Sequence, residues 1–128
     1  MDAIDPQRGE IWKVRFDKTL GQEIRKERRA LVMNVPRVGR DKMRIVVPIT
    51  TGDERFEHLF WMTRIRRDST NGLENDSFAD ASQIQAVSLR RFSSQVGALR
   101  LPAQIDSVAD AIALCIGQGK NKKKRKRK

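Results

Sequence analysis

The side chains that could do chemistry in this chain are mostly arginines, threonines, serines and carboxylates. The sequence holds one histidine, His58, and one cysteine, Cys115, which are far apart along the chain. It contains no HExxH, CxxC or EF-hand pattern and no glycine-rich phosphate-binding loop. A Ser-His-Asp triad would need His58, but the charged stretch DERFEHLF around it favours a position at the surface or at a strand edge. We therefore expect no metal site and no cofactor.

Arginine and threonine can support one reaction without a metal, the cleavage of RNA. The 2′-hydroxyl of RNA is a built-in nucleophile, so a protein need only orient it, move protons and neutralise the charge on the phosphorane. Arginine suits the last task because its planar fork can contact two phosphate oxygens. Composition alone does not select this reaction, since an arginine-rich strand protein can equally be a plain binder.

Length and composition indicate one small domain. The chain has 128 residues, of which 38% are hydrophobic and 34% charged, enough for one modest core. The formal net charge is +11, and residues 120–128 contribute eight of the positive charges. The part before this tail therefore carries +3 (+11 less +8).

Several features favour a cytoplasmic protein with no membrane contact. No run of about 20 apolar residues could span a membrane. The N-terminus, MDAIDPQRGE, is polar and contains two aspartates, unlike a secretory signal peptide. A single cysteine offers no disulfide framework, which suits a reducing compartment. Cys115 lies among Ile112, Leu114 and Ile116, and we expect it to be a small buried hydrophobe.

Apolar patterns predict strands in the first part of the chain. Trp12, Val14 and Phe16 alternate with charged residues, which is the period of a half-buried strand. The other expected strands are residues 30–35, 43–50 and 59–65, and a less decided one within 77–87. Loops are expected at residues 17–27 and 66–76, and a turn at 37–42.

Two helices are expected to close the domain. Ser88 can cap a helix over about residues 89–96, which Gly97 would stop. A second helix is expected from Pro102 to about Gly117, with apolar residues at helical spacing: Ile105, Val108, Ile112, Cys115 and Ile116. Strands followed by helices predict a small β-barrel or half-barrel with helical decoration.

Two segments near the N-terminus resemble the MazF/PemK toxins. Residues 8–16, RGEIWKVRF, are similar to the RGEIW or RGDIY start of that family. The residues that follow resemble its D-P-T…G-x-E loop: Asp17, Thr19, Gly21 and Glu23. Residues 28–33, RRALVM, occupy the place of the family's R-P-V-[LV]-[IV] strand.

Two later segments extend the resemblance in the same order. Residues 45–52, IVVPITTG, resemble the family's VVVP[VI]TSG strand. Residues 83–87, QIQAV, are similar to the start of its Q-[IP]-R-T-I-D…R…[IV]-G segment, and the matching residues continue with Ser88, Leu89, Arg90, Val96 and Gly97. The resemblance covers roughly residues 8–116.

The resemblance implies a fold and an activity. The fold would be mainly β (α+β), a small SH3-like twisted barrel of about five to seven strands with one or two helices near the C-terminus. Family members usually pair into homodimers and are commonly endoribonucleases that cut messenger RNA without a metal and leave a cyclic phosphate. A cognate antitoxin lays an acidic segment across the RNA groove. The implied partners are therefore RNA, an acidic antitoxin and a second copy of the chain.

When the family's functional positions are matched to this sequence, the resemblance implies two residues at the reaction centre. The family's strand-two arginine falls on Arg28 without a gap from Gly21, and its strand-three threonine falls on Thr50. The proline that normally follows the arginine is absent, so Arg29 stays an alternative. The residues that would contact RNA are Asp17, Thr19, Gln22, Arg29, Thr51, Gln83 and Gln85.

This sequence departs from the family pattern just before residues 83–87. PemK-like members place an arginine and an aspartate there and MazF-like members a glutamate, whereas this chain has Asp80 and Ser82. Gln85 stands where an arginine is frequent, and Gln22 where PemK-like members have a histidine. A serine cannot act as a carboxylate base, and Asp80 would repel phosphate. A weakened relative that binds nucleic acid or antitoxin without cutting is therefore one alternative.

Two further expectations complete the prediction. A toxin that inhibits gyrase, like the CcdB toxins, is another alternative, but the lysine-rich end differs from their apolar-aromatic C-terminus. We expect a toxin domain over residues 8–117 and a disordered basic tail over 118–128, because GKNKKKRKRK has no apolar residue to order it. The tail is either a solubilising segment or attracts RNA phosphates or ribosomes without sequence preference.

Overall fold

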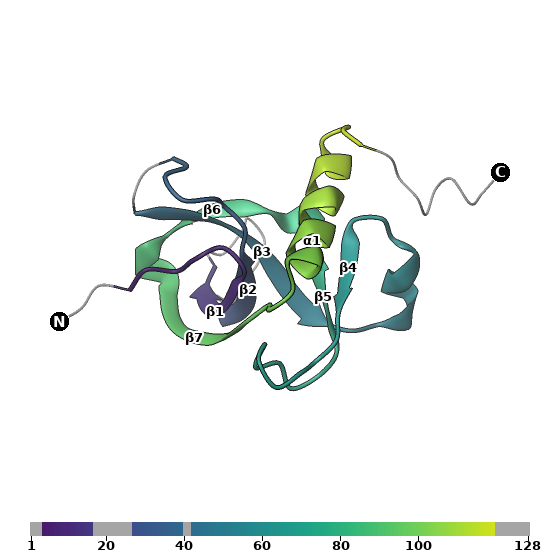
Figure 1. Ribbon diagram of the computed structural model, residues 1–128, viewed down its shortest axis with the longest axis horizontal. Coiled ribbons are helices and arrows are strands. Elements are labelled where there is room, and N and C mark those ends of the chain that lie inside the picture. The colour runs from purple at the N-terminus through teal and green to yellow at the C-terminus, as the bar shows by residue number, and fades with distance from the viewer. Residues whose placement is uncertain (1–3, 17–26, 40–41, 120–128) are drawn as a thin grey trace, which may run out of the picture.

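Seven strands and one α-helix make up the protein, as seen in a computed structural model that describes residues 4–16, 27–39 and 42–119 (Figure 1). The strands are β1 (Glu10–Arg15), β2 (Glu27–Val32), β3 (Met43–Thr51), β4 (Met62–Ile65), β5 (Ser77–Asp80), β6 (Gln85–Ser88) and β7 (Phe92–Ala98). The helix α1 spans Pro102–Cys115, and three 3-10 helices lie at η1 (Glu54–His58), η2 (Ala81–Gln83) and η3 (Leu89–Arg91). The mainly β fold with a C-terminal helix is confirmed.

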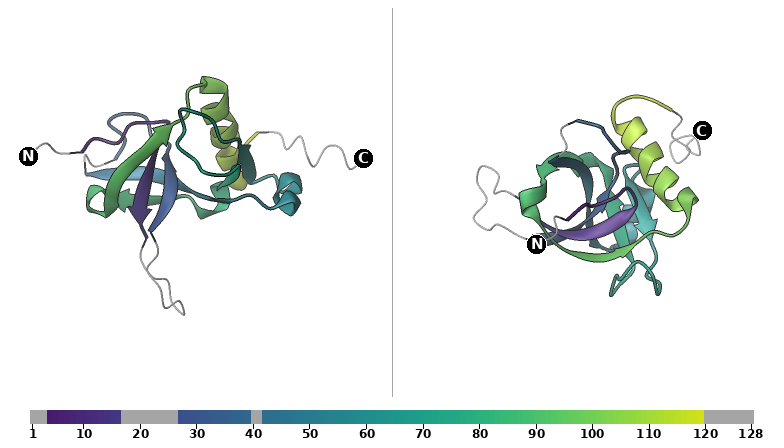
Figure 2. Two further views of the ribbon diagram at one scale, coloured as in Figure 1. Left: turned by 90° about the horizontal axis from the view of Figure 1, so that it is seen from below. Right: turned by 60° about the vertical axis from the view of Figure 1, so that its left-hand side comes forward.

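The strands form one antiparallel sheet that does not close. Its order is β4-β5-β3-β2-β1-β7, and β6 also pairs with β3. β3 is the central strand because it pairs with β2 and β6 over its first part and with β5 over its last three residues. The sheet curls into an open half-barrel, with α1 on its outside (Figure 2). Of the two expected forms, barrel and half-barrel, the structure therefore shows the half-barrel. Its seven strands are the upper end of the predicted five to seven.

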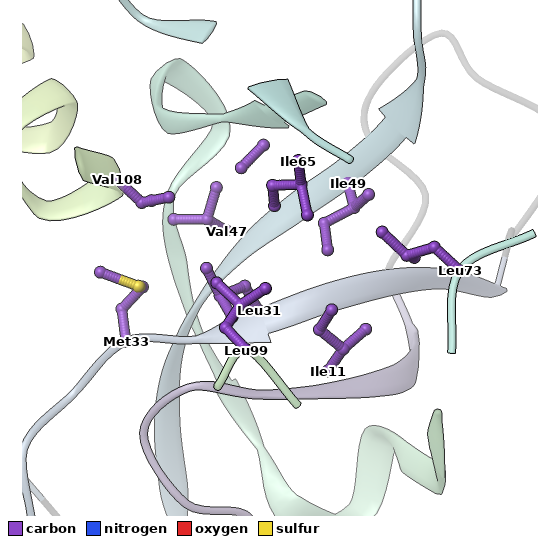
Figure 3. Close-up of a cluster of buried hydrophobic side chains, with 10 residues drawn as sticks. Ile11, Leu31, Met33, Val47, Ile49, Ile65, Leu73, Leu99 and Val108 are labelled. Carbon is purple, nitrogen blue, oxygen red and sulfur yellow. The ribbon is translucent and has the colours of Figure 1, made fainter. Parts of the chain in front are cut away.

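The sheet has an apolar cluster on each face, which explains the nearly continuous apolar runs of its central strands. On β2, Leu31 points to the cluster shown in Figure 3, and α1 adds Val108 to that cluster. Ala30 and Val32 point to the other side, where they pack with Trp12 and other buried side chains inside the curl. Side chains that alternate between two buried faces fix the register of the strand, because a slip of one residue would exchange them.

The structure corrects the helix expected at residues 89–96. Ser88 does cap, since its Oγ accepts a hydrogen bond from the Arg90 N–H at 3.2 Å, but the capped segment is only the 3-10 turn η3. The chain then continues as β7, paired with β1, and buries Phe92 against Trp12 inside the curl. Pairing with β1 therefore replaced the helix that the local cap favoured.

Two other expectations need correction. The strand expected at residues 59–65 begins only at Met62, because η1 and a turn precede it. Cys115 is exposed, not buried. The buried residues of α1 are Val108 and Ala111, and burial fades toward the end of the helix. Partial desolvation and then the charge of Asp80 raise the pKa of the Cys115 thiol, so it is a weak nucleophile at neutral pH.

The predicted loop at residues 66–76 folds back onto β7 and is held by a buried amide. Asn71 is fully buried; its Oδ1 accepts from the N–H groups of Asp68 (3.2 Å) and Leu73 (3.0 Å), and its Nδ2 donates to the Arg66 carbonyl (2.8 Å). The loop backbone lies so close to β7 that a Cβ on Gly97 would fall 2.4 Å from the Asn71 carbonyl oxygen. The absence of a side chain at Gly97 therefore allows the loop backbone to pack directly against β7.

Replacing Gly97 with alanine should destabilise the protein by about 2 kcal/mol or more, because backbone on both sides must move to make room for the methyl group. Urea unfolding followed by circular dichroism measures the change. Ser94→Ala, at an exposed position of the same strand, is the matched control and should change the free energy of unfolding by less than about 0.5 kcal/mol. Equal stability of the two variants would contradict the close packing of the loop on β7.

No helix within the described part of the chain is long and apolar enough to cross a membrane. Residues 120–128 lie outside the described residues, so the basic tail and the boundary at residue 117 stay predictions. The last helix ends at Cys115, shortly before that boundary.

Candidate functional site

Arg28 and Thr50 lie on the same face of the sheet, on neighbouring antiparallel strands. The last pair between β2 and β3 toward this end is Ala30 with Pro48. Two residues further, β2 reaches Arg28 and β3 reaches Thr50, and a step of two residues keeps the same face. Arg28 is exposed and Thr50 is half-buried. The two residues that the family resemblance places at the reaction centre thus share one face at one end of the strand pair.

Arg29 and Thr51 belong to the opposite face by the same alternation. A terminal nitrogen of Arg29 lies 3.5 Å from the Glu74 carboxylate, which comes from the loop at residues 66–76. The Arg29 Nε is buried and makes no hydrogen bond within the described part of the protein. Thr51 is exposed and pairs with Ser77. Because Arg29 points to the face opposite Thr50 and pairs with Glu74 there, Arg28 is the arginine that shares the face of Thr50.

The face with Thr50 continues onto two further strands. Thr50 pairs with Phe78 of β5, and Phe78 pairs with Arg64 of β4. We call Arg28, Thr50, Phe78 and Arg64 the strand row. The Phe78 ring is buried, with Arg64 5.3 Å above its centroid and the Phe56 ring edge-on at 5.6 Å. Sequence reasoning missed Arg64, because only the pairing of β4 with β5 brings it into line with Thr50.

Gln83 and Gln85 are exposed but are not brought next to Thr50. Gln85 begins β6 and pairs with Val46, four residues before Thr50 on β3. At strand spacing, four residues separate the two positions by about 13 Å. Gln83 ends η2, the three-residue turn that interrupts the partner strand between β5 and β6. Gln85 therefore lies along β3 away from the end that carries Thr50, and Gln83 lies in the turn between β5 and β6.

Asp80 and Ser82, where the sequence departs from the family pattern, are engaged with each other. The Asp80 carboxylate accepts hydrogen bonds from the Ser82 N–H at 3.0 Å and from the Ser82 hydroxyl at 2.6 Å. These bonds cap the start of η2. The pair therefore has a local structural role, in which one oxygen of the Asp80 carboxylate accepts both hydrogen bonds.

An ion pair follows the strand end that carries Thr50. Asp53 caps η1, and both its carboxylate oxygens contact Arg55. Hydrogen bonds from the Arg55 side chain, and then from its backbone N–H, lower the pKa of Asp53 to about 2. The carboxylate is therefore ionised throughout the physiological range, and its charge is balanced by Arg55.

Titration of Asp53 by NMR should give a midpoint near pH 2, and Arg55→Gln should return the midpoint toward 3.8. Because the folded pKa is depressed, the stabilisation from this cap is present above the ordinary pKa and is lost as the pH falls toward 2. Arg66→Gln, which removes the partner of Asp76 instead, is the matched control and should leave the Asp53 midpoint unchanged. A midpoint near 3.8 in the unaltered protein would contradict the bidentate pair.

Three predicted RNA contacts, Asp17, Thr19 and Gln22, lie outside the described residues and stay predictions. His58 is exposed at the end of η1, as expected. Across the described ranges, no three His, Cys, Asp or Glu side chains gather where they could hold a metal ion. The chemistry available in the strand row is therefore that of two guanidinium groups and one hydroxyl.

The open half-barrel with one C-terminal helix is a small α+β fold, and its strand row carries two arginines and a threonine. A family model described as "PemK-like, MazF-like toxin of type II toxin-antitoxin system" matches residues 7–116. The chain belongs to this toxin family.

Individual proteins are similar to this chain in sequence or in fold. The endoribonuclease MazF9 of Mycobacterium tuberculosis (strain ATCC 25618 / H37Rv) is 27% identical over 114 residues, which cover 84% of this chain and 93% of the relative. MazF of Deinococcus radiodurans has a similar fold, with a TM-score of 0.71 at 16% identity over 90% of this chain and 99% of that chain. A mycobacterial endoribonuclease in complex with its cognate antitoxin gives a TM-score of 0.66 at 17% identity, over 90% and 98% of the two chains.

Proposed function

We propose that this toxin is an endoribonuclease that cuts messenger RNA by attack of a 2′-hydroxyl, without a metal. The observation that carries the proposal is the placement of Arg28 and Thr50 on one face of neighbouring strands, each two residues beyond the last pair between β2 and β3, Ala30 with Pro48. The relative MazF9 is itself named an endoribonuclease, which is the activity proposed here. The strand row offers what the reaction needs, since RNA supplies the nucleophile itself.

In the proposed reaction the 2′-oxygen attacks the adjacent phosphorus and the bond to the 5′-oxygen breaks. The products are a cyclic phosphate and a 5′-hydroxyl; the proton leaves the 2′-oxygen and one is delivered to the 5′-oxygen. Arg28 contacts the phosphate oxygens and stabilises the charge that develops on them. Thr50 hydrogen-bonds at the same phosphate and assists proton movement. Arg29 is left as an RNA contact or a structural residue, because its ion pair with Glu74 is on the opposite face.

The proposed assembly follows from the same family. We propose a homodimer in the bacterial cytoplasm, with RNA bound in a groove across the two copies and an acidic antitoxin competing for it. One structural relative is bound to its cognate antitoxin. The net charge of +11 favours both polyanionic RNA and an acidic partner. The tail at residues 120–128, with eight positive charges, would add contacts to RNA or ribosomes that do not depend on sequence.

Incubation of the purified protein with a long RNA of mixed sequence in EDTA tests the proposal. Cleavage with cyclic phosphate ends is the expected result, and the absence of any cut would overturn it. The second candidate is a relative that binds RNA or antitoxin without cutting. It is favoured by Ser82, which stands in place of a carboxylate and donates its hydroxyl hydrogen bond to Asp80. RNA binding without cleavage in the same experiment would support that candidate.

A further inference from the structure

Arg64 ends the strand row on the side of Thr50 opposite to Arg28. The sheet order places β5 between β3 and β4, and Phe78 pairs with Thr50 on one side and with Arg64 on the other. Neighbouring strands are about 4.8 Å apart, so the Cα atoms of Arg64 and Thr50 lie about 10 Å from each other. Two arginines thus flank the threonine on one continuous face, which suits a polyanion lying across the strands better than a single phosphate.

The Arg64 guanidinium is held in place but has hydrogen-bonding capacity left. Its carbon lies 5.3 Å from the Phe78 ring centroid, and its Nε is 3.6 Å from the Glu57 carboxylate. Its Nη1 is buried and has no hydrogen-bond partner among the described residues. A buried donor of a charged group without a partner is unfavourable, so an oxyanion that draws the guanidinium outward would relieve this cost. The side chain is 30% exposed, which leaves it a path to the surface.

We propose that Arg64 binds a backbone phosphate of the RNA next to the scissile one, so that the RNA runs across the strands from β2 to β4. This inference rests on the proposed function. Arg28 lies on β2, the direct neighbour of β3 in the sheet, whereas Phe78 of β5 separates Thr50 from Arg64. Arg64 is therefore placed to hold the substrate, and Arg28 to act at the reacting phosphorus. The RNA phosphate would accept the hydrogen bond that Nη1 does not make within the described part of the protein.

Binding is best measured on a mixed-sequence single-stranded oligonucleotide with 2′-O-methyl sugars, which keeps every phosphate and cannot be cut. Arg64→Gln should weaken its binding about tenfold, the value of one charge-assisted hydrogen bond. It should also reduce the slope of log K against log salt by about 0.7, as expected for one phosphate contact on a single strand. Arg66→Gln is the matched control, because Arg66 is an exposed arginine two residues further along the chain and its replacement removes the same charge. It should change the affinity by less than about twofold.

A second variant separates a phosphate contact from a merely structural ion pair. Glu57→Gln breaks the same ion pair but leaves the Arg64 charge free, so it should keep or improve the affinity for the oligonucleotide. Equal losses in Glu57→Gln and Arg64→Gln would overturn the inference, and so would wild-type affinity of Arg64→Gln or no binding by the wild type. The thermal midpoint of each variant identifies any loss caused by unfolding, and Arg64→Lys, which keeps the charge, then repeats the test with an expected partial loss.

Cleavage kinetics distinguish this inference from the proposed function. With a cleavable RNA, Arg64→Gln should raise KM about tenfold and change kcat little, because the residue contacts a phosphate that does not react. If the wild type cuts and the variant has wild-type KM, only the role of Arg64 is overturned. If the wild type cuts no RNA, the proposed function fails, while the oligonucleotide assay still decides whether Arg64 contacts phosphate.

Discussion

An RNA that carries hydrogen instead of the 2′-hydroxyl at the scissile nucleotide should not be cut by this protein. In the proposed reaction that hydroxyl is the nucleophile, and the protein contributes charge stabilisation and orientation around it. An intramolecular nucleophile held beside its target has an effective concentration of about 10⁵ M or more, so its removal should lower the rate by about five orders of magnitude. The measurement is the single-turnover rate on a short RNA with one deoxynucleotide at the cleaved position.

The control is the same RNA with the deoxynucleotide placed one position further along the chain. Its 2′-hydroxyl does not react, so the rate should stay within about tenfold of that of unmodified RNA, because only one weak contact is lost. Cleavage of the first substrate at a normal rate would mean that water is the nucleophile. That result would overturn the proposed reaction, because arginine and threonine suffice only if the RNA supplies its own nucleophile.

Most of the fold could be predicted because the apolar pattern and the tertiary packing agree. Residues 43–50 have a high content of β-branched residues, and β3 is indeed the central strand of the sheet. The helix after Pro102 was predicted from apolar residues at helical spacing, and Val108 and Ala111 of that helix are buried. In both elements the local preference of the chain and the buried face lead to the same structure.

The helix expected at residues 89–96 was wrong because its signals have a second explanation. Leu89, Phe92 and Val96 are spaced like one face of a helix, with a cap before them and a glycine after them. In the structure Phe92 belongs to the cluster inside the curl, and Gly97 makes room for the backbone of Asn71. These contacts join residues that are distant in sequence, so they could not be derived from the local pattern.

The candidate site shows the same division. Arg28 and Thr50 could be proposed from the sequence, but the choice between Arg28 and Arg29 could not be made there. A shift of one residue along a strand moves a side chain to the opposite face. The pairing of Ala30 with Pro48 and the contact of Arg29 with Glu74 are both needed to assign the two arginines to their faces. Arg64 required in addition the pairing of two strands that no sequence motif connects.

Arg28→Ala and Thr50→Val should each lower the rate of RNA cleavage sharply while the protein stays folded. Removal of one preorganised group that stabilises the transition state typically costs about 10²–10³ in rate, or roughly 3–4 kcal/mol. Valine keeps the branched shape of Thr50 and its preference for a strand, so its effect reports on the hydroxyl. Arg28 is exposed and makes no ion pair within the described residues, so its truncation should affect stability by less than about 0.5 kcal/mol.

Arg29→Ala is the matched control for Arg28→Ala, because it removes the same group one residue along the same strand. It should lower the cleavage rate by less than about tenfold, since the side chain lies on the other face and pairs with Glu74. The Arg28 and Thr50 double variant should lose less than the product of the two single losses, because groups that act on one transition state are not independent. A larger loss in Arg29→Ala than in Arg28→Ala would move the catalytic role to Arg29. If all three residues can be replaced without effect in an active protein, the strand row is not the reaction centre.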